Sequence, residues 1–210
     1  MLWSFAIVYK ISAAGPCIES FAMKSIDEKN SISLRVLLFA VIAIAGSAAD
    51  LASKEAVFAW RGLPNENPPW WLVKDLAGIE TAVNIGALFG MGAGFGWFFA
   101  LASIVTSIAI FIWLIGYGAA HSRWLTVGLG CVMGGIIGNL YDRLGMWYKP
   151  GMPVEWKSGV RDWILLCYNG YTWPNFNIAD SLLVCGAIML AWHSLMSTSH
   201  PPQETIIESD

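Results

Sequence analysis

Two aspartates, Asp142 and Asp180, each follow an asparagine by three residues, Asn139 and Asn177 respectively. Residues at i and i+3 share a helix face, so each carboxylate is expected beside an amide of its own helix. Two carboxylates that share a partly dry site cannot easily both ionise, so one keeps a proton while the other stays anionic. The anion can activate a water molecule to attack a carbonyl carbon, and the protonated acid can donate to the carbonyl oxygen. This chemistry cleaves an amide bond and needs neither a metal ion nor an organic cofactor.

Composition indicates that these acids belong to a membrane protein. Of the 210 residues, 56% are hydrophobic and 13% are charged, whereas a soluble domain carries roughly 25% charged residues. The net charge of -3 is too small to indicate a nucleic acid as partner. The cysteines form no CxxC pair and no Cys/His cluster, which argues against a zinc site or a disulfide framework; they are Cys17, Cys131, Cys167 and Cys185.

Four apolar stretches can cross a bilayer, which takes roughly 20 residues in a helix. We predict spans at about residues 34–53, 95–117, 124–141 and 178–196. The third carries glycines at four-residue spacing, Gly130, Gly134 and Gly138, which allow a neighbouring helix to approach closely.

The segments between the spans differ in length. Loops 55–94 and 142–177 are long, and the first contains a predicted short strand at 79–83. Residues 1–33 are interpreted as an N-terminal extension and 198–210 as a disordered tail. The sequence therefore predicts an all-α membrane protein, a four-transmembrane-helix bundle with a small β-containing cradle and a lid loop, within residues 34–197.

Topology brings the polar residues to one end of this bundle. Consecutive spans run antiparallel, so the ends of spans one and three and the starts of spans two and four lie at the same membrane face. The polar residues found at those ends are Asp50, Lys54, Asn84, Asn139, Asp142, Arg143, Asn177 and Asp180. Ionisable groups are costly at membrane depth, so this convergence predicts a functional site.

Each acid also has a structural interpretation. Asp180 begins a predicted helix, where aspartate is a common N-cap. Asp142 and Arg143 could form an ion pair that anchors a span in the headgroups. Asp50 and Lys54, at i and i+4, are typical of an intrahelical salt bridge. Only their joint occurrence at one face favours a catalytic site.

Two sequence strings resemble the signature motifs of the lipoprotein signal peptidases (signal peptidase II). Residues 134–143, GGIIGNLYDR, resemble the family's GGxxGNxxDR, and residues 176–181, FNIADS, resemble its FNxADS. Residues 84–90, NIGALFG, resemble NxGAAFG with one alanine replaced by Leu88, and Asp50 to Lys54 resembles DxxxK. The four motifs keep the family's order.

The resemblance implies roles for these residues. Asp142 and Asp180 would be the catalytic dyad of an aspartic endopeptidase. The substrate site would be lined by Asn84, Asn139, Arg143 and Asn177. Structural or peripheral roles would fall to Asp50, Lys54, Gly86 and Gly138.

The family removes signal peptides from prolipoproteins and cuts before a cysteine that carries a diacylglyceryl group. The resemblance therefore implies prolipoprotein substrates, contact with membrane lipid, and inhibition by globomycin-type cyclic peptides. It implies no cofactor and no metal, and we expect a monomer. The expected location is the bacterial cytoplasmic (inner) membrane, with both termini in the cytoplasm and the site at the extracytoplasmic face.

Two features depart from the family. The interval between Asp142 and Asp180 is unusually long, and residues 145–159 look like an insertion that would enlarge the lid. Residues 160–163, VRDW, then resemble the family's hydrophobic-Asp-Phe segment. Lys and Arg number five on the expected cytoplasmic side and seven on the other, against the positive-inside tendency, so the orientation rests on the resemblance.

Three other functions are compatible with buried acids. A small proton-coupled transporter could use the same residues, but its sites lie near mid-bilayer on broken helices. Peptidases of the presenilin or prepilin type carry GxGD, which is absent from this sequence. In an inert membrane scaffold, the acids would serve only as caps and anchors.

Overall fold

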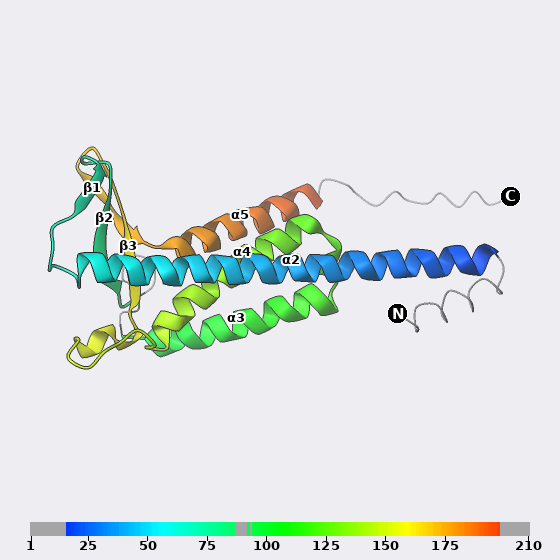
Figure 1. The fold of residues 1–210 in the computed structure, drawn as a ribbon, viewed down its shortest axis with the longest axis horizontal. Helices are drawn as coiled ribbons and strands as arrows, with labels where there is room; N and C mark the ends of the chain where they lie inside the picture. Colours follow the sequence, from blue (N-terminus) through cyan, green and yellow to red (C-terminus); the bar gives the residue numbers. More distant parts are fainter. Residues whose placement is uncertain (1–15, 87–91, 93, 198–210) are drawn as a thin grey trace.

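The computed structural model describes residues 16–86, 92 and 94–197. Long helices run side by side, and a small sheet covers one end of them (Figure 1). The helices are α2 (Pro16–Arg61), α3 (Gly96–Gly116), α4 (Arg123–Arg143) and α5 (Ile178–Ser197). The strands are β1 (Trp70–Val73), β2 (Ala77–Asn84), β3 (Val160–Tyr168) and β4 (Tyr171–Phe176). Two short 3-10 helices, η2 (Ala119–His121) and η3 (Val154–Ser158), complete the described elements.

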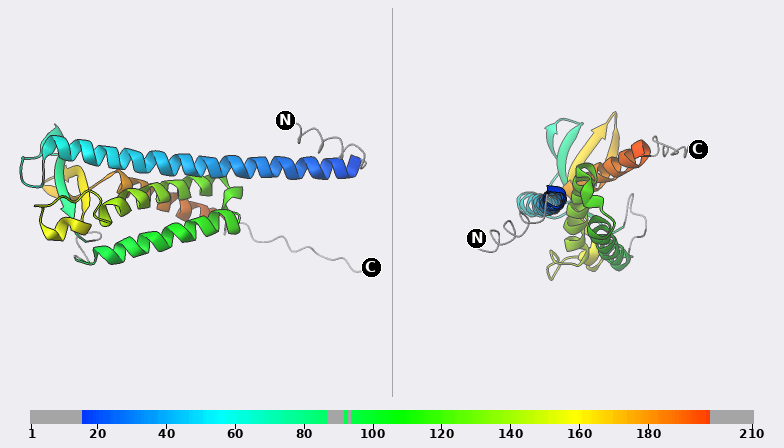
Figure 2. Two further views of the ribbon diagram at one scale, coloured as in Figure 1. Left: turned by 60° about the horizontal axis from the view of Figure 1, so that its bottom comes forward. Right: turned by 90° about the vertical axis from the view of Figure 1, so that its right-hand side faces the viewer.

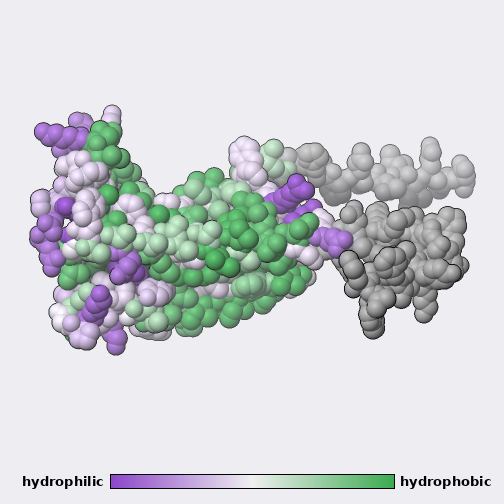
Figure 3. Space-filling view, in the orientation of Figure 1, coloured by the Kyte–Doolittle hydropathy of each residue, from purple (hydrophilic) through white to green (hydrophobic). Residues whose placement is uncertain are grey.

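Within the described residues, four helices are long and apolar enough to cross a membrane. Helix α4 is the central one, because it contacts each of the other three (Figure 2). The outer face of α3 exposes large apolar side chains such as Leu101, Val105 and Ile112, which is the pattern of a surface that faces lipid. The apolar surface covers the helices and the polar surface gathers at the sheet end (Figure 3). The prediction that four apolar helices accompany a small β-containing unit is confirmed.

The glycines of α4 bring the neighbouring helices into close contact. A Cβ atom on Gly134 would lie 3.1 Å from the carbonyl oxygen of Ala43 in α2. One on Gly135 would lie 2.5 Å from the carbonyl oxygen of Ala179 in α5. Helix α4 can therefore pack against α2 and α5 at backbone distance, as the four-residue glycine spacing predicted.

Helix α2 is longer than the predicted first span. It begins at Pro16, inside the predicted N-terminal extension, and continues past residue 53 to Arg61. The stretch Asn30–Arg61, which contains a window apolar enough to cross a membrane, has 32 residues and is about 48 Å long, more than the roughly 30 Å of the hydrocarbon core. The last turns of α2 therefore project beyond the apolar layer and support the sheet. Residues 1–15 and the tail 198–210 lie outside the described residues.

The sheet joins two loops that are far apart in the sequence. Its strands are antiparallel in the order β1-β2-β3-β4, and the predicted strand at 79–83 lies within β2. The pairing of β2 with β3 places Ala82 opposite Asp162 and Asn84 opposite Val160. The loop between α2 and α3 is thus fixed to the loop between α4 and α5 directly above the helix ends.

The segment 145–159, which the sequence marked as an insertion, packs against the end of α2. Trp147 is buried and donates from Nε1 to the carbonyl oxygen of Gly159 at 2.9 Å. Its ring meets Phe58 of α2 edge to face, with 6.0 Å between the ring centroids. The segment is therefore anchored at its base.

The contact of Gly138 with a buried carboxylate predicts a large mutational effect. A Cβ on Gly138 would lie 2.5 Å from Oδ2 of Asp50 and 3.2 Å from the Cβ of Ala179. We expect Gly138→Ala to destabilise the protein by about 1–3 kcal/mol, because the added methyl displaces a buried carboxylate. Thermal unfolding in detergent measures the change.

Gly116→Ala is the matched control, because its Cβ would meet only Ile112 of the same helix, at 3.9 Å. Equal unfolding temperatures for the two variants would contradict close packing at Gly138.

Candidate active site

A buried ion network joins α2 to α4 beneath the sheet. Lys54 Nζ lies 2.7 Å from Asp50 Oδ2 and 3.3 Å from Asp142 Oδ2, and all three side chains are fully buried. The same ammonium donates to Asn139 Oδ1 at 3.0 Å. Asp50 Oδ1 accepts from the backbone N–H of Ala179 at 2.9 Å, which ties α2 to the start of α5. The predicted salt bridge between Asp50 and Lys54 is confirmed, and it extends to Asp142.

Asp142 is held by a residue outside the predicted set, Arg161 of β3. The Arg161 backbone N–H donates to Asp142 Oδ2 at 2.9 Å. Its Nε and Nη2 donate to Oδ1 at 3.2 and 2.9 Å. The guanidinium also pairs with Glu55 at 3.0 Å and lies over the rings of Phe58 and Trp147. With Lys54 added, Asp142 has two cationic partners.

Asp180 is positioned by Asn177 at the start of α5. The Asn177 side chain accepts from the Asp180 N–H at 2.9 Å, and Asp180 Oδ2 accepts from the Asn177 N–H at 3.3 Å. This reciprocal arrangement is a capping box, in which Asn177 and not Asp180 is the N-cap. Asp180 Oδ1 accepts from Asn139 Nδ2 at 2.8 Å. Asn139 therefore serves the aspartate of α5 and not Asp142 of its own helix, contrary to the i to i+3 expectation.

Asp162 of β3 lies beside Asp180 and has no cation in direct contact in the described structure. Its side chain is 2% exposed, and Oδ1 accepts from Asn177 Nδ2 at 2.6 Å. The Asn84 side chain also lies near Asp162 and favours its charged form. Burial, and after it the negative charge of Asp180, raise the pKa of Asp162 from 3.8 to about 8. Asp162 therefore keeps its proton at neutral pH.

Sequence reasoning named Asp162 only as part of a matching segment. The sequence feature that could have indicated it is an acid within residues 160–166, VRDWILL, where only Arg161 and Asp162 are charged. Strand alternation turns Arg161 and Asp162 to opposite faces, so the first reaches Asp142 and the second reaches Asn177.

Arg143 holds the backbone that follows β2. It donates to the carbonyl oxygens of Asn84 (3.2 Å), Ser158 (2.9 Å) and Gly86. Its guanidinium lies 5.2 Å from the centre of the Phe99 ring. The Asn84 side chain accepts from the Gly86 N–H at 3.0 Å. Arg143 and Gly86 thus fix the turn that presents Asn84 to Asp162.

The predicted residues therefore divide into two groups. Asn84 and Asn177 lie beside Asp162, and Asn139 and Asn177 hydrogen-bond Asp180. Asp50, Lys54 and Asp142 form the ion network with Arg161, and Asn139 joins the two groups because its Oδ1 accepts from Lys54. Gly138 packs against Asp50. In the part of the chain that the structure describes, no group of three or more His, Cys, Asp or Glu side chains is placed to hold a metal ion.

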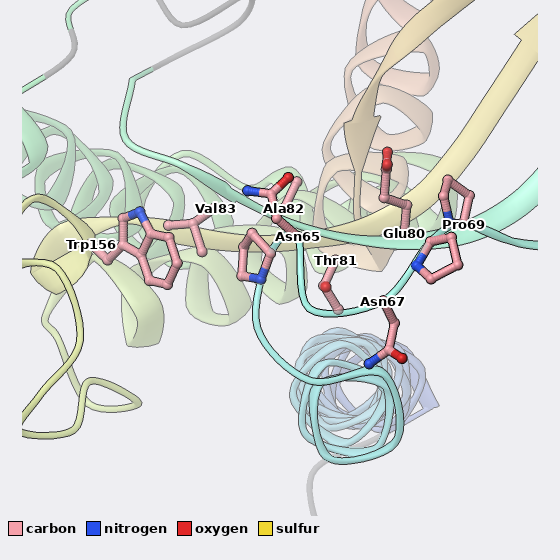
Figure 4. A pocket seen from close by; sticks show the side chains of 10 residues that line it. Asn65, Asn67, Pro69, Glu80, Thr81, Ala82, Val83 and Trp156 are labelled. Atoms are coloured by element: carbon pink, nitrogen blue, oxygen red, sulfur yellow. The ribbon is translucent and has the colours of Figure 1, made fainter.

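A separate hollow of about 530 Å³ lies beside β2, between the loop that follows α2 and η3 (Figure 4). Its lining residues are Pro64, Asn65, Asn67, Pro68, Pro69, Glu80, Thr81, Ala82, Val83 and Trp156. The sequence contained no motif for this hollow.

Comparison with known proteins places this geometry in a family. The model of the family "Signal peptidase (SPase) II" matches residues 42–196. A lipoprotein signal peptidase of Rhodopirellula baltica is 58% identical over 171 residues, which cover 81% of this chain and 77% of that protein. A lipoprotein signal peptidase of Rhodococcus jostii is 37% identical over 158 residues, covering 74% of this chain and 71% of that protein.

Two solved structures described as bacterial membrane enzymes are also similar. One has a TM-score of 0.67 at 24% identity and covers 80% of this chain and 94% of its own. The other has a TM-score of 0.62 at 25% identity and covers 75% of this chain and 92% of its own. The fold, the motifs and the relatives agree, and the chain belongs to the signal peptidase II family of membrane peptidases.

Proposed function

We propose that this chain is a membrane aspartic endopeptidase that removes signal peptides from prolipoproteins, and that Asp162 and Asp180 are its catalytic acids. The observation that carries this proposal is the position of Asn177, whose side chain binds Asp162 while its backbone N–H binds Asp180. One asparagine thus holds two acids of unlike environment, Asp162 through its side chain and Asp180 through its backbone N–H. Asp162 is buried with a raised pKa, whereas Asp180 is only partly buried.

The unlike environments assign the roles. Asp180, as the anion at a helix N-terminus, takes a proton from a water molecule that attacks the scissile carbonyl carbon. Asp162 gives its proton to the carbonyl oxygen as negative charge develops there. The C–N bond of the tetrahedral intermediate then breaks. Its nitrogen takes the proton held by Asp180, and a hydroxyl proton returns to Asp162, which restores the starting state.

Asp142 fits a positioning role better than the catalytic role that the motif implied. Its carboxylate is fully buried, and Arg161 and Lys54 occupy both of its oxygens. By holding both the backbone and the guanidinium of Arg161, it fixes the strand residue that precedes Asp162. We therefore propose Asp162 as the partner of Asp180, with Asp142 as a positioning residue.

The remaining polar residues support the dyad. Asn139 and Asn177 orient Asp180, and Asn84 and Asn177 orient Asp162. The contacts of Arg143 with three backbone carbonyls favour a supporting role over direct substrate binding. The proposed substrate contacts stay Asn84, Asn139 and Asn177, because each of them lies beside one or both of the acids.

The position of the dyad fits a lipid-bearing substrate. The two acids come from β3 and the first turn of α5, where the sheet meets the helix ends. Acyl chains can therefore stay in the bilayer while a peptide bond reaches the acids. We propose cleavage before a diacylglyceryl cysteine, inhibition by globomycin-type peptides, and an inner-membrane location. The sheet would lie at the extracytoplasmic face and both termini in the cytoplasm. A transporter would carry its acids near mid-bilayer on broken helices, whereas Asp162 lies in β3 and Asp180 in the first turn of α5.

Substitution separates the two candidate dyads. We expect Asp162→Asn and Asp180→Asn each to lower kcat by at least about 10²-fold to 10⁴-fold, because each removes a group that transfers a proton. We expect Asp142→Asn to lower the unfolding temperature and to leave measurable cleavage. A gel-shift assay with diacylglyceryl-modified prolipoprotein measures cleavage, and thermal unfolding measures folding. Normal cleavage by Asp162→Asn, together with a folded and inactive Asp142→Asn, would return Asp142 to the dyad.

The raised pKa of Asp162 predicts the pH dependence. Its proton is bound below about pH 8 and lost above it. We therefore expect kcat/KM to fall as the pH rises through about 8, because the general acid is lost. Rates of cleavage measured across this range at fixed ionic strength test the expectation. A profile that stays flat through pH 8 would remove Asp162 as the acid.

A further inference from the structure

Strand β2 has an open edge over half of its length. Strand β1 pairs with β2 only at residues 77–79, through Trp70, Trp71 and Val73. On that side, residues 80–84 have no strand partner among the described residues. The hollow of about 530 Å³ lies along this stretch, and Figure 4 shows β2 passing through it above the loop that follows α2.

The contacts of Arg161 show which backbone groups this edge offers. Arg161 pairs with Val83, yet its N–H donates to Asp142 and its carbonyl accepts from Asn177. Neither group is directed at β2, so Val83 and Arg161 form a non-hydrogen-bonded pair. The N–H and C=O of Val83 therefore point away from β3, toward the hollow. A free donor and acceptor on one residue are what an added extended strand needs.

The hollow is suited to a polar chain. Asn65 and Asn67 come from the loop on one side, and Trp156 closes one end beside Val83 (Figure 4). Trp156 belongs to η3, inside the segment 145–159 that the sequence marked as an insertion. Amide side chains and one aromatic ring can contact varied side chains of an extended peptide without selecting a charge.

The open edge leads directly to the proposed dyad. Ala82 is paired with Asp162, and Asn84, which follows Val83, is paired with Val160, two residues before Asp162. Adjacent strands lie about 4.8 Å apart, so a chain added to β2 would run two strand spacings from β3. A few residues of extended polypeptide therefore suffice to connect the open edge of β2 with the proposed dyad.

We propose that this hollow binds the prolipoprotein polypeptide that follows the lipidated cysteine, as an extended strand added to the free edge of β2. The proposal rests on the proposed function. The hollow lies beside the sheet (Figure 4), whereas the signal peptide is apolar and stays among the membrane helices, so the polypeptide on the other side of the cleaved bond is the occupant. The insertion supplies Trp156 and so gives this enzyme a contact with the mature part of its substrate.

The test compares two lipidated substrates with the same signal peptide. The short one ends directly after the cysteine, and the long one continues for about eight residues, enough for a strand of ordinary length. The full-length enzyme is assayed in detergent as wild type, Val83→Pro, Trp156→Ala and Val83→Thr. Proline removes the outward N–H and is tolerated where a strand edge is free. Threonine keeps the N–H and serves as the matched control.

We expect the wild type to have a KM about tenfold lower for the long substrate than for the short one, the effect of one or two net hydrogen bonds. Val83→Pro and Trp156→Ala should remove this advantage, with kcat and the KM for the short substrate unchanged. Val83→Thr should keep it.

Equal KM values for both substrates in the wild type would overturn the proposal. So would variants that raise KM for the short substrate as much as for the long one. Asp162→Asn and Asp180→Asn are assayed alongside. If they cleave normally, the proposed catalytic function is wrong. That outcome is distinct from equal KM values for the two substrates, which would show that the hollow does not bind the polypeptide.

Discussion

Four charged side chains are buried together under the sheet, and the geometry of the site depends on their mutual neutralisation. Asp50, Lys54, Asp142 and Arg161 come from α2, α4 and β3, and their side chains are at most 3% exposed. Burying an isolated ion away from water costs several kcal/mol of folding free energy. Removing one member of a buried ion pair destabilises a protein by about 3–5 kcal/mol. The two cations and two anions therefore have to be brought in together. That requirement fixes the relative positions of two helices and a strand more tightly than apolar packing would.

The network also explains why aspartates of the same chain behave differently. Asp50 and Asp142 each contact a cation. Asp162 follows Arg161 directly, but strand alternation directs it to the other face, where asparagines and Asp180 surround it. Asparagine can donate a hydrogen bond without supplying a positive charge. The site thus holds Asp162 in place and leaves its pKa high, which a lysine or arginine at those positions would prevent.

Sequence patterns predicted the features that depend on neighbours along one helix. The Asp50 to Lys54 bridge and the glycine face of α4 follow from spacings of four residues, and both are present. The association of Asn139 with Asp180 crosses from α4 to α5 and could not follow from such a spacing. Asp162 was overlooked for the same reason. Its place beside Asp180 depends on the pairing of β3 with β2, a contact between two loops that no local pattern specifies.

The ion network and the open edge of β2 lie in different parts of the structure. The proposed catalytic acids, which must be held rigidly, are therefore separate from the proposed peptide site, whose surroundings can vary. The dyad needs its acids held to within a fraction of an ångström, and the network and the capping box at α5 provide this from helix ends. Recognition of the polypeptide beyond the cleavage site needs only backbone groups, which any sequence offers. An insertion can be accommodated there without disturbing the catalytic geometry, because Trp147 anchors its base against Phe58 while Trp156 reaches the hollow. The long interval between Asp142 and Asp180 is thus compatible with an unchanged dyad, since residues 145–159 lie between the end of α4 and the start of β3 and interrupt neither element.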